Sequence, residues 1–101
     1  MKISSKSQEF SNRIYVIVGA AGHLGRALSC ELAESGAQLV LIDSNKEGLM
    51  ELCTSLQDRF DSNPEYFVCD IEQSRNRRRT LSIVSSKHPR IDGVVNCAHV
   101  S

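Results

Sequence analysis

Four short apolar runs alternate along the chain with longer stretches whose apolar positions recur every three or four residues. The short runs are rich in Val, Ile and Leu and show little polar alternation. The run at residues 13–18 is continuous and β-branched, which is typical of a strand that a parallel sheet buries on both faces. We therefore predict strands at residues 13–18, 37–43, 66–69 and 91–98.

The longer stretches predict helices between these strands. The first helix covers residues 22–35 and stops at Gly36. Its apolar face consists of Leu24, Ala27, Leu28 and Leu32. The second helix begins at a capping box formed by Ser44 and Glu47. Its apolar face consists of Leu49, Leu52, Cys53, Leu56 and Phe60.

A third helix is predicted by a weaker pattern. Its inner face consists of Arg77, Leu81, Val84 and His88. Pro89 ends this helix, because a proline ring disfavours a helical conformation in the residue before it. Ser74 is one candidate for its N-terminal cap, and Asp70 at the end of the preceding strand is the other. Residues 61–64, Asp-Ser-Asn-Pro, predict a loop by their composition.

The order β-α-β-α-β-α-β predicts an α/β fold, the first half of a Rossmann-like, doubly wound parallel sheet. Right-handed crossovers between parallel strands give the expected strand order 3-2-1-4. Residues 1–12 are polar and predict a flexible N-terminal arm, which leaves residues 13–101 for the sheet and its helices. Ligands of such sheets bind beyond the carboxyl ends of the strands.

Three glycines, Gly19, Gly22 and Gly25, stand between the first strand and the first helix. The spacing Gly-x-x-Gly-x-x-Gly suits a tight turn, a close approach of backbone to a pyrophosphate, and close packing of helix on strand, in that order. We therefore expect this turn to hold a dinucleotide at the helix N-terminus. His23 lies inside the turn, where it either faces the phosphates or is an exposed loop residue.

Charge and cysteine content narrow the partners. Twelve basic and twelve acidic residues give a formal net charge of zero, so we expect neither nucleic acid nor an anionic membrane as a partner. The only basic cluster, which predicts a solvated helix face, consists of Arg75, Arg77, Arg78 and Arg79. Four separated cysteines predict neither disulfides nor a metal site. With no apolar run near the roughly 18 residues of a membrane span, we expect a cytoplasmic protein.

These motifs occur together in an order that resembles the N-terminal half of the short-chain dehydrogenase/reductase family. The resemblance covers roughly residues 10–101 and rests on the glycine turn, Asp43 after the second strand, Asp70-Ile71 after the third, and the segment 91–98. It implies that the glycines carry the pyrophosphate, Asp43 the adenosine ribose, and Asp70 the adenine, with Asn96 and Ala98 steadying the sheet beside the cofactor. The expected cofactor-binding residues are Gly19, Gly22, His23, Leu24, Gly25, Asp43, Asp70, Ile71, Asn96 and Ala98.

The cofactor expected at this site is NAD in preference to NADP. A carboxylate at Asp43 would accept the ribose hydroxyl protons of NAD and repel the 2′-phosphate of NADP. Asp43 as a solvent-facing residue before the second helix is the competing interpretation.

The branch of the family is less clear from the motifs. Gly22 resembles the extended, sugar-nucleotide-modifying branch, because the single-domain branch has its middle glycine where this chain has His23. The segment around Asn96 resembles the single-domain branch, although Cys97 and His99 replace an Asn and a Gly of its motif. An extended-type epimerase or dehydratase is therefore an alternative, as is a non-catalytic nucleotide-binding or interaction module.

The family's catalytic Tyr-x-x-x-Lys is missing from these 101 residues, because neither Tyr15 nor Tyr66 is followed by Lys at the fourth position. The sequence thus indicates a fragment that has the cofactor-binding half and no catalytic residues. We expect such a chain to be inactive alone. We also expect it to form a homo-oligomer or to associate through the exposed edge of its fourth strand.

Overall fold

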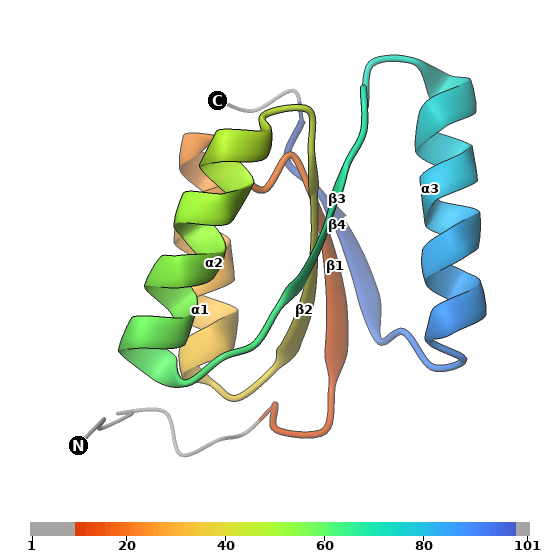
Figure 1. The fold of residues 1–101 in the computed structure, drawn as a ribbon. Coiled ribbons are helices and arrows are strands. Elements are labelled where there is room, and N and C mark those ends of the chain that lie inside the picture. The colour runs from red at the N-terminus through yellow and green to blue at the C-terminus, as the bar shows by residue number, and fades with distance from the viewer. Residues whose placement is uncertain (1–9, 99–101) are drawn as a thin grey trace.

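The fold is built on a parallel sheet of four strands in the order β3-β2-β1-β4, as predicted. We describe it from a computed structural model of the chain, in which residues 10–98 are described. The elements in chain order are β1 (Ile14–Val18), α1 (His23–Glu34), β2 (Gln38–Asp43), α2 (Lys46–Phe60), β3 (Glu65–Val68), α3 (Ser74–Lys87) and β4 (Gly93–Asn96). Helices α1 and α2 cover one face of the sheet and α3 lies on the other (Figure 1).

The two central strands explain the uninterrupted apolar runs. Ile17 of β1 and Leu41 of β2 pack against α1 and α2, while their neighbours Val16, Val18 and Ile42 face α3. All five side chains are buried, because both faces of these strands are covered. The sheet therefore separates two apolar layers, and alternate residues of the same strands contribute side chains to one layer or the other.

The edge strands β3 and β4 are covered less completely than the two central strands. Each alternates half-buried and exposed residues, so that Val68 of β3 is 49% exposed and Val94 of β4 is 54% exposed. Both strands have one sheet neighbour among the described residues, since β3 pairs with β2 and β4 pairs with β1. Their apolar character does not by itself show that they are covered.

Helix α1 ends at its C-terminus just before Gly36, as predicted. This glycine has φ +90°, a left-handed conformation that side chains disfavour. Its N–H bonds to the carbonyl of Ala33, and the N–H of Ala37 bonds to that of Leu32, which is the hydrogen-bond pattern of a Schellman stop. The chain therefore reverses after α1 and enters β2 directly.

The predicted capping box at Ser44 and Glu47 is wrong. Asn45 is the N-cap of α2, and its side-chain oxygen accepts a hydrogen bond from the N–H of Gly48 at 3.0 Å. The reason lies two residues earlier, because Asp43 Oδ1 accepts the N–H of Asn45 and holds this turn. The helix therefore begins one residue later than the sequence pattern indicates.

Neither predicted cap of α3 is correct. The N-cap is Gln73, which makes no hydrogen bond of the capping type, and Ser74 is the first helical residue. Asp70 instead holds the loop before the helix, where its carboxylate accepts the N–H of Glu72 and the side-chain amide of Gln73. The predicted inner face is confirmed at Val84, which is fully buried.

At the opposite end of the sheet, Asp92 and Phe10 hold the start of β1. Asp92 accepts the N–H of Ile14 at 2.8 Å and donates its own N–H to the carbonyl of the same residue. The first of these bonds holds the pKa of Asp92 below its ordinary value. Phe10, part of the predicted arm, is half-buried and stacks edge-on against Tyr15. Residues 1–9 of that arm and His99 lie outside the described residues.

Candidate functional site

A cleft of about 430 Å³ lies at the carboxyl ends of the strands. This volume is within the range of small-molecule sites, about 300–1,000 Å³. The cleft is lined by Gly19, Ala21, Gly22, Asp43, Ser44, Asn45, Asp70, Ile71, Glu72, Cys97 and Ala98. Its walls thus come from the turns after all four strands, which is where ligands of doubly wound sheets bind.

Two of the glycines are required by close contacts. Gly19 has φ +81°, and a Cβ there would lie 2.7 Å from the backbone nitrogen of Ala98. A Cβ at Gly25 would lie 2.2 Å from the carbonyl oxygen of Gly19, so any side chain would push α1 away from β1. Gly22 lines the cleft as the N-cap of α1. The glycine spacing therefore creates a cradle of bare backbone next to a helix N-terminus.

The N-terminus of α1 differs from that of α2 in how its N–H groups are satisfied. Helix α2 has a side-chain cap at Asn45 and an acid, Glu47, in its first turn. Helix α1 has no side-chain cap, no acid in its first turn, and Arg26 in that turn. An anion at the α1 N-terminus would supply both the missing acceptors and the missing negative charge.

Asp43 is half-buried at the end of β2, in the cleft wall. Its two oxygens accept the N–H groups of Ala21 at 2.9 Å and Asn45 at 3.0 Å. The carboxylate therefore joins the turn after β1 to the turn after β2. Because a carboxylate has about four acceptor positions, it retains the capacity to bind hydroxyl groups as well.

The end of β3 supplies Asp70 and Ile71 to the cleft. Arg77 donates a hydrogen bond to the carbonyl of Ile71 at 2.7 Å and so fixes this turn from α3. Arg77 is half-buried, whereas Arg75, Arg78 and Arg79 are exposed. The prediction of a solvated basic face is therefore wrong at Arg77, whose guanidinium binds the backbone carbonyl of Ile71.

The remaining predicted site residues lie around the cleft without lining it. His23 and Leu24 are exposed in the first turn of α1, and Gly25 is buried beneath it. Asn96 is exposed, and its side-chain oxygen accepts the N–H of Ala98 at 2.9 Å. Asn96 thus shapes the turn after β4, while Ala98 contributes to the cleft wall.

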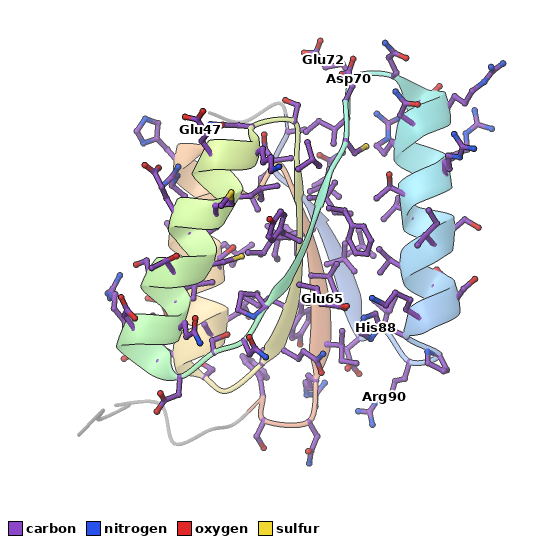
Figure 2. All side chains as sticks on the ribbon, in the orientation of Figure 1. Glu47, Glu65, Asp70, Glu72, His88 and Arg90 are labelled. Carbon is purple, nitrogen blue, oxygen red and sulfur yellow. The ribbon has the colours of Figure 1, made fainter. Side chains whose placement is uncertain are left out.

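The charged side chains that line the cleft are all acidic. Figure 2 shows Asp70 and Glu72 after β3 and Glu47 at the start of α2, all at the end of the molecule where the strands finish. Asp43, Asp70 and Glu72 line the cleft, and none of the described lining residues is Lys, Arg or His. Burial raises the pKa of the Cys97 thiol in the same wall, so this group is neutral.

Sequence reasoning missed several lining residues, among them Ala21, Asn45, Glu72 and Cys97. Asn45 was obscured by the stronger capping-box signature at the residue before it. The residue that could have indicated Asn45 is Asp43. An aspartate side chain commonly accepts the N–H of the residue two positions later and so forms a local turn. Here that turn ends at Asn45, which then caps the helix.

Comparison with known proteins agrees with this geometry. A sequence profile of the short chain dehydrogenase family matches residues 13–101. This chain belongs to that family. Among its curated relatives, the bovine protein (Bos taurus) named short-chain dehydrogenase/reductase family 16C member 6 is 33% identical over 98 residues, which cover 97% of this chain and 31% of the relative. The family resemblance seen in the motifs is therefore confirmed.

Solved structures of family members resemble this short-chain dehydrogenase closely. An NAD⁺-bound xylitol dehydrogenase is 27% identical with a TM-score of 0.77, over 85% of this chain and 33% of the solved one. A putative short chain dehydrogenase of Shigella flexneri 2a, solved with NADP, is 26% identical with a TM-score of 0.79, over 88% and 38%. The chain thus spans well under half the length of these relatives.

Proposed function

We propose that this chain is the cofactor-binding part of an NAD-dependent oxidoreductase of the short-chain dehydrogenase family. The observation that carries the proposal is the convergence of the family's motif residues on one cleft at the carboxyl ends of the strands. The backbone cradle at Gly19 and the anion-ready N-terminus of α1 suit a pyrophosphate. Asp43 would accept the ribose hydroxyls, and Asp70 with Ile71 would border the adenine.

The preference for NAD over NADP rests on the charges that line the cleft. Three carboxylates and no basic side chain line it among the described residues. A 2′-phosphate placed about 4 Å from the Asp43 carboxylate would be repelled by roughly 4 kcal/mol at an effective dielectric near 20. Since about 1.4 kcal/mol corresponds to a tenfold change in affinity, even partial screening would leave a clear preference. The similar solved structures include complexes with NAD⁺, with NADP and with NADPH, so the family allows either cofactor.

Titration of the purified protein with NAD and with NADP tests this proposal. We expect NAD to bind at least about tenfold more tightly. Asp43→Asn removes the charge, keeps an acceptor oxygen, and should narrow the ratio between the two cofactors. Glu47→Gln is the matched control, because it removes an exposed carboxylate from the same end of the molecule without altering the lining of the cleft. Equal or tighter binding of NADP by the unmutated protein would show that Asp43 does not face the ribose.

Hydride transfer itself is proposed from the family. Bound NAD would supply the hydride acceptor, and this chain's residues would bind and orient its adenosine and pyrophosphate. Tyr15 and Tyr66, the only tyrosines printed in this sequence, are followed by Gly19 and Asp70 at the fourth position and so lack the family's lysine. We therefore propose that these residues hold cofactor without catalysing the reaction.

Two further parts of the proposal concern location and assembly. We propose a cytoplasmic location, supported by four free thiols among the described residues. No described helix combines the length and apolar character needed to cross a bilayer. We also propose self-association through β4, supported by its single sheet neighbour and the exposure of Val94.

A further inference from the structure

Two charged side chains form hydrogen bonds with the backbone of Ala21, the residue directly before Gly22. Asp43 Oδ2 accepts the N–H of Ala21 at 2.9 Å, and Arg26 Nε donates to the carbonyl oxygen of Ala21 at 2.7 Å. These two atoms of Ala21 belong to successive peptide planes. The orientations of both planes are therefore fixed by charge-assisted hydrogen bonds, which are the stronger kind.

The second of these planes joins Ala21 to Gly22, the N-cap of α1. It directly precedes the N–H groups of the first turn of α1, a turn that has no side-chain cap and contains no acidic residue. A tilt of this plane would re-aim those donors. Arg26 thus controls, through one carbonyl oxygen, the direction of the groups that suit a pyrophosphate.

The first turn of α2 lies close to Ala21 and Arg26. Gly48 is buried there, and a Cβ on it would lie 3.0 Å from both Ala21 Cβ and Arg26 Nη2. Its N–H is accepted by Asn45, whose own N–H is accepted by Asp43. These hydrogen bonds form a chain that links the turn after β1, through the turn after β2, to the first turn of α2.

We propose that Arg26 is a positioning residue for the dinucleotide, acting through the Ala21 carbonyl, and that Gly48 leaves the space in which it does so. This inference rests on the proposed function and assigns the residues that preorganise its site. A cation in the first turn of a helix is unfavourable to that helix, so a functional role accounts for a residue that the local rule would exclude.

A different role for Arg26 would be to attract the cofactor's phosphates by charge alone. Three substitutions separate the two roles. Arg26→Gln is neutral and carries an amide nitrogen the same number of bonds from Cα as Nε. Arg26→Lys keeps the charge and has no donor at that atom. Arg26→Met has similar reach but neither charge nor donor.

Calorimetric titration with NAD, alongside thermal unfolding of each variant, tests the proposal. We expect Arg26→Met and Arg26→Lys to weaken binding about tenfold, and Arg26→Gln to restore it to within about threefold of the parent. Glu51→Gln is the control, because it removes the exposed carboxylate that lies 3.6 Å from Arg26 Nη2 and leaves the Nε bond in place. It should bind NAD like the parent.

Gly48→Ala supplies a second, independent variant. Alanine normally stabilises a helix relative to glycine, by up to about 1 kcal/mol. Its Cβ would lie 2.6 Å from Asn45 Nδ2 and 3.0 Å from Arg26 Nη2, which are side-chain ends that can shift, and 3.0 Å from Ala21 Cβ, which is fixed to the backbone. These effects on stability oppose each other, so we expect a midpoint of unfolding close to the parent's together with weaker binding of NAD. A residue with a merely structural role would not separate these two readouts.

The outcomes are distinguishable. Tight binding by Arg26→Lys with weak binding by Arg26→Gln would assign Arg26 to charge attraction and overturn the inference. Parent-like affinity in Arg26→Met and in Gly48→Ala would also overturn it, while leaving the proposed function intact. Failure of the unmutated protein to bind either NAD or NADP would overturn the proposed function, and the positioning role with it.

Discussion

Replacement of Gly25 by alanine tests how α1 is fitted to β1. The added Cβ would lie 2.2 Å from the carbonyl oxygen of Gly19 and 2.7 Å from Ala20 Cα, where ordinary contact begins at 3.4 Å. Both opposing atoms belong to the backbone, so a rotamer change cannot relieve the contact. Helix and turn must separate by about 1 Å, the scale on which overpacking typically costs about 1–3 kcal/mol or more.

The net effect must be set against the helix preference for alanine, which favours the variant by about 1 kcal/mol. We therefore expect a loss of about 2 kcal/mol in the free energy of unfolding. For a domain of this size such a loss lowers the midpoint of thermal unfolding by roughly 8–16 °C. Circular dichroism during heating measures this midpoint, and chemical denaturation gives the free energy.

Gly93→Ala is the matched control. A Cβ at this position would meet only the ring edge of Tyr15 at 3.0–3.1 Å, which a small rotation of that half-buried side chain relieves. We expect its midpoint to stay close to the parent's. A midpoint for Gly25→Ala equal to or above that of the parent would refute the close-packing role assigned to this glycine.

Three further outcomes are expected. Lys87 at 2.6 Å and His88 hold the pKa of Glu65 below its ordinary value, so this site stabilises the fold above that value and loses the effect as pH falls through the lowered pKa; Glu65→Gln should remove this part of the acid dependence, about 1 kcal/mol or less. If acid unfolding curves of parent and variant superimpose, the pairing is energetically silent. Val94→Lys should reduce concentration-dependent association measured by sedimentation, because it places a charge on the exposed β4 edge, and a parent that stays monomeric at all concentrations contradicts this. The 101-residue chain should show no turnover of NAD in an absorbance assay, and activity that survives repeated purification would contradict the proposal that these residues hold cofactor without catalysing the reaction.

The pairing of Glu65 with Lys87 and His88 shows that the two ends of the molecule differ in how their acidic residues are neutralised. Figure 2 shows Glu65 and His88 side by side, away from the edge that carries Asp70 and Glu72. At the Glu65 end the acid is matched by two basic groups, whereas the cleft end keeps its carboxylates without basic side chains among its lining residues. Protonation of Glu65 therefore lowers the stability of the fold from the end of the molecule away from the cleft.

Much of the fold was predictable because it depends on periodicity and on glycine. The apolar runs and the stop at Gly36 gave the element order, and the handedness of crossovers gave strand order 3-2-1-4. Gly19 and Gly25 were predicted from their spacing between strand and helix together with the motifs further along the chain, and each lies at a backbone contact that excludes a side chain.

The remaining features depend on hydrogen bonds between side chains and backbone, which spacing does not reveal. The displaced cap at Asn45 follows from one oxygen of Asp43, and the inward turn of Arg77 follows from one carbonyl at Ile71. Arg26 reads in sequence as an ordinary helical residue, since nothing in the pattern indicates that Ala21 lies within its reach. The binding roles of His23, Leu24 and Asn96 stay predictions, with these residues placed at the rim of the cleft or away from it.

The pairing of β1 with β4 has a kinetic consequence. Ile14 and Asp92, which exchange two hydrogen bonds, are 78 residues apart, whereas β1 meets β2 across only 24 residues, from Ile14 to Gln38. Closing the longer loop costs about 1 kcal/mol more in chain entropy, so β4 is expected to dock late in folding. Cys97 and Ala98 become a wall of the cleft only when it does. A nucleotide held there would slow the release of β4, and the protein's lifetime in the folded state would then depend on how much cofactor surrounds it.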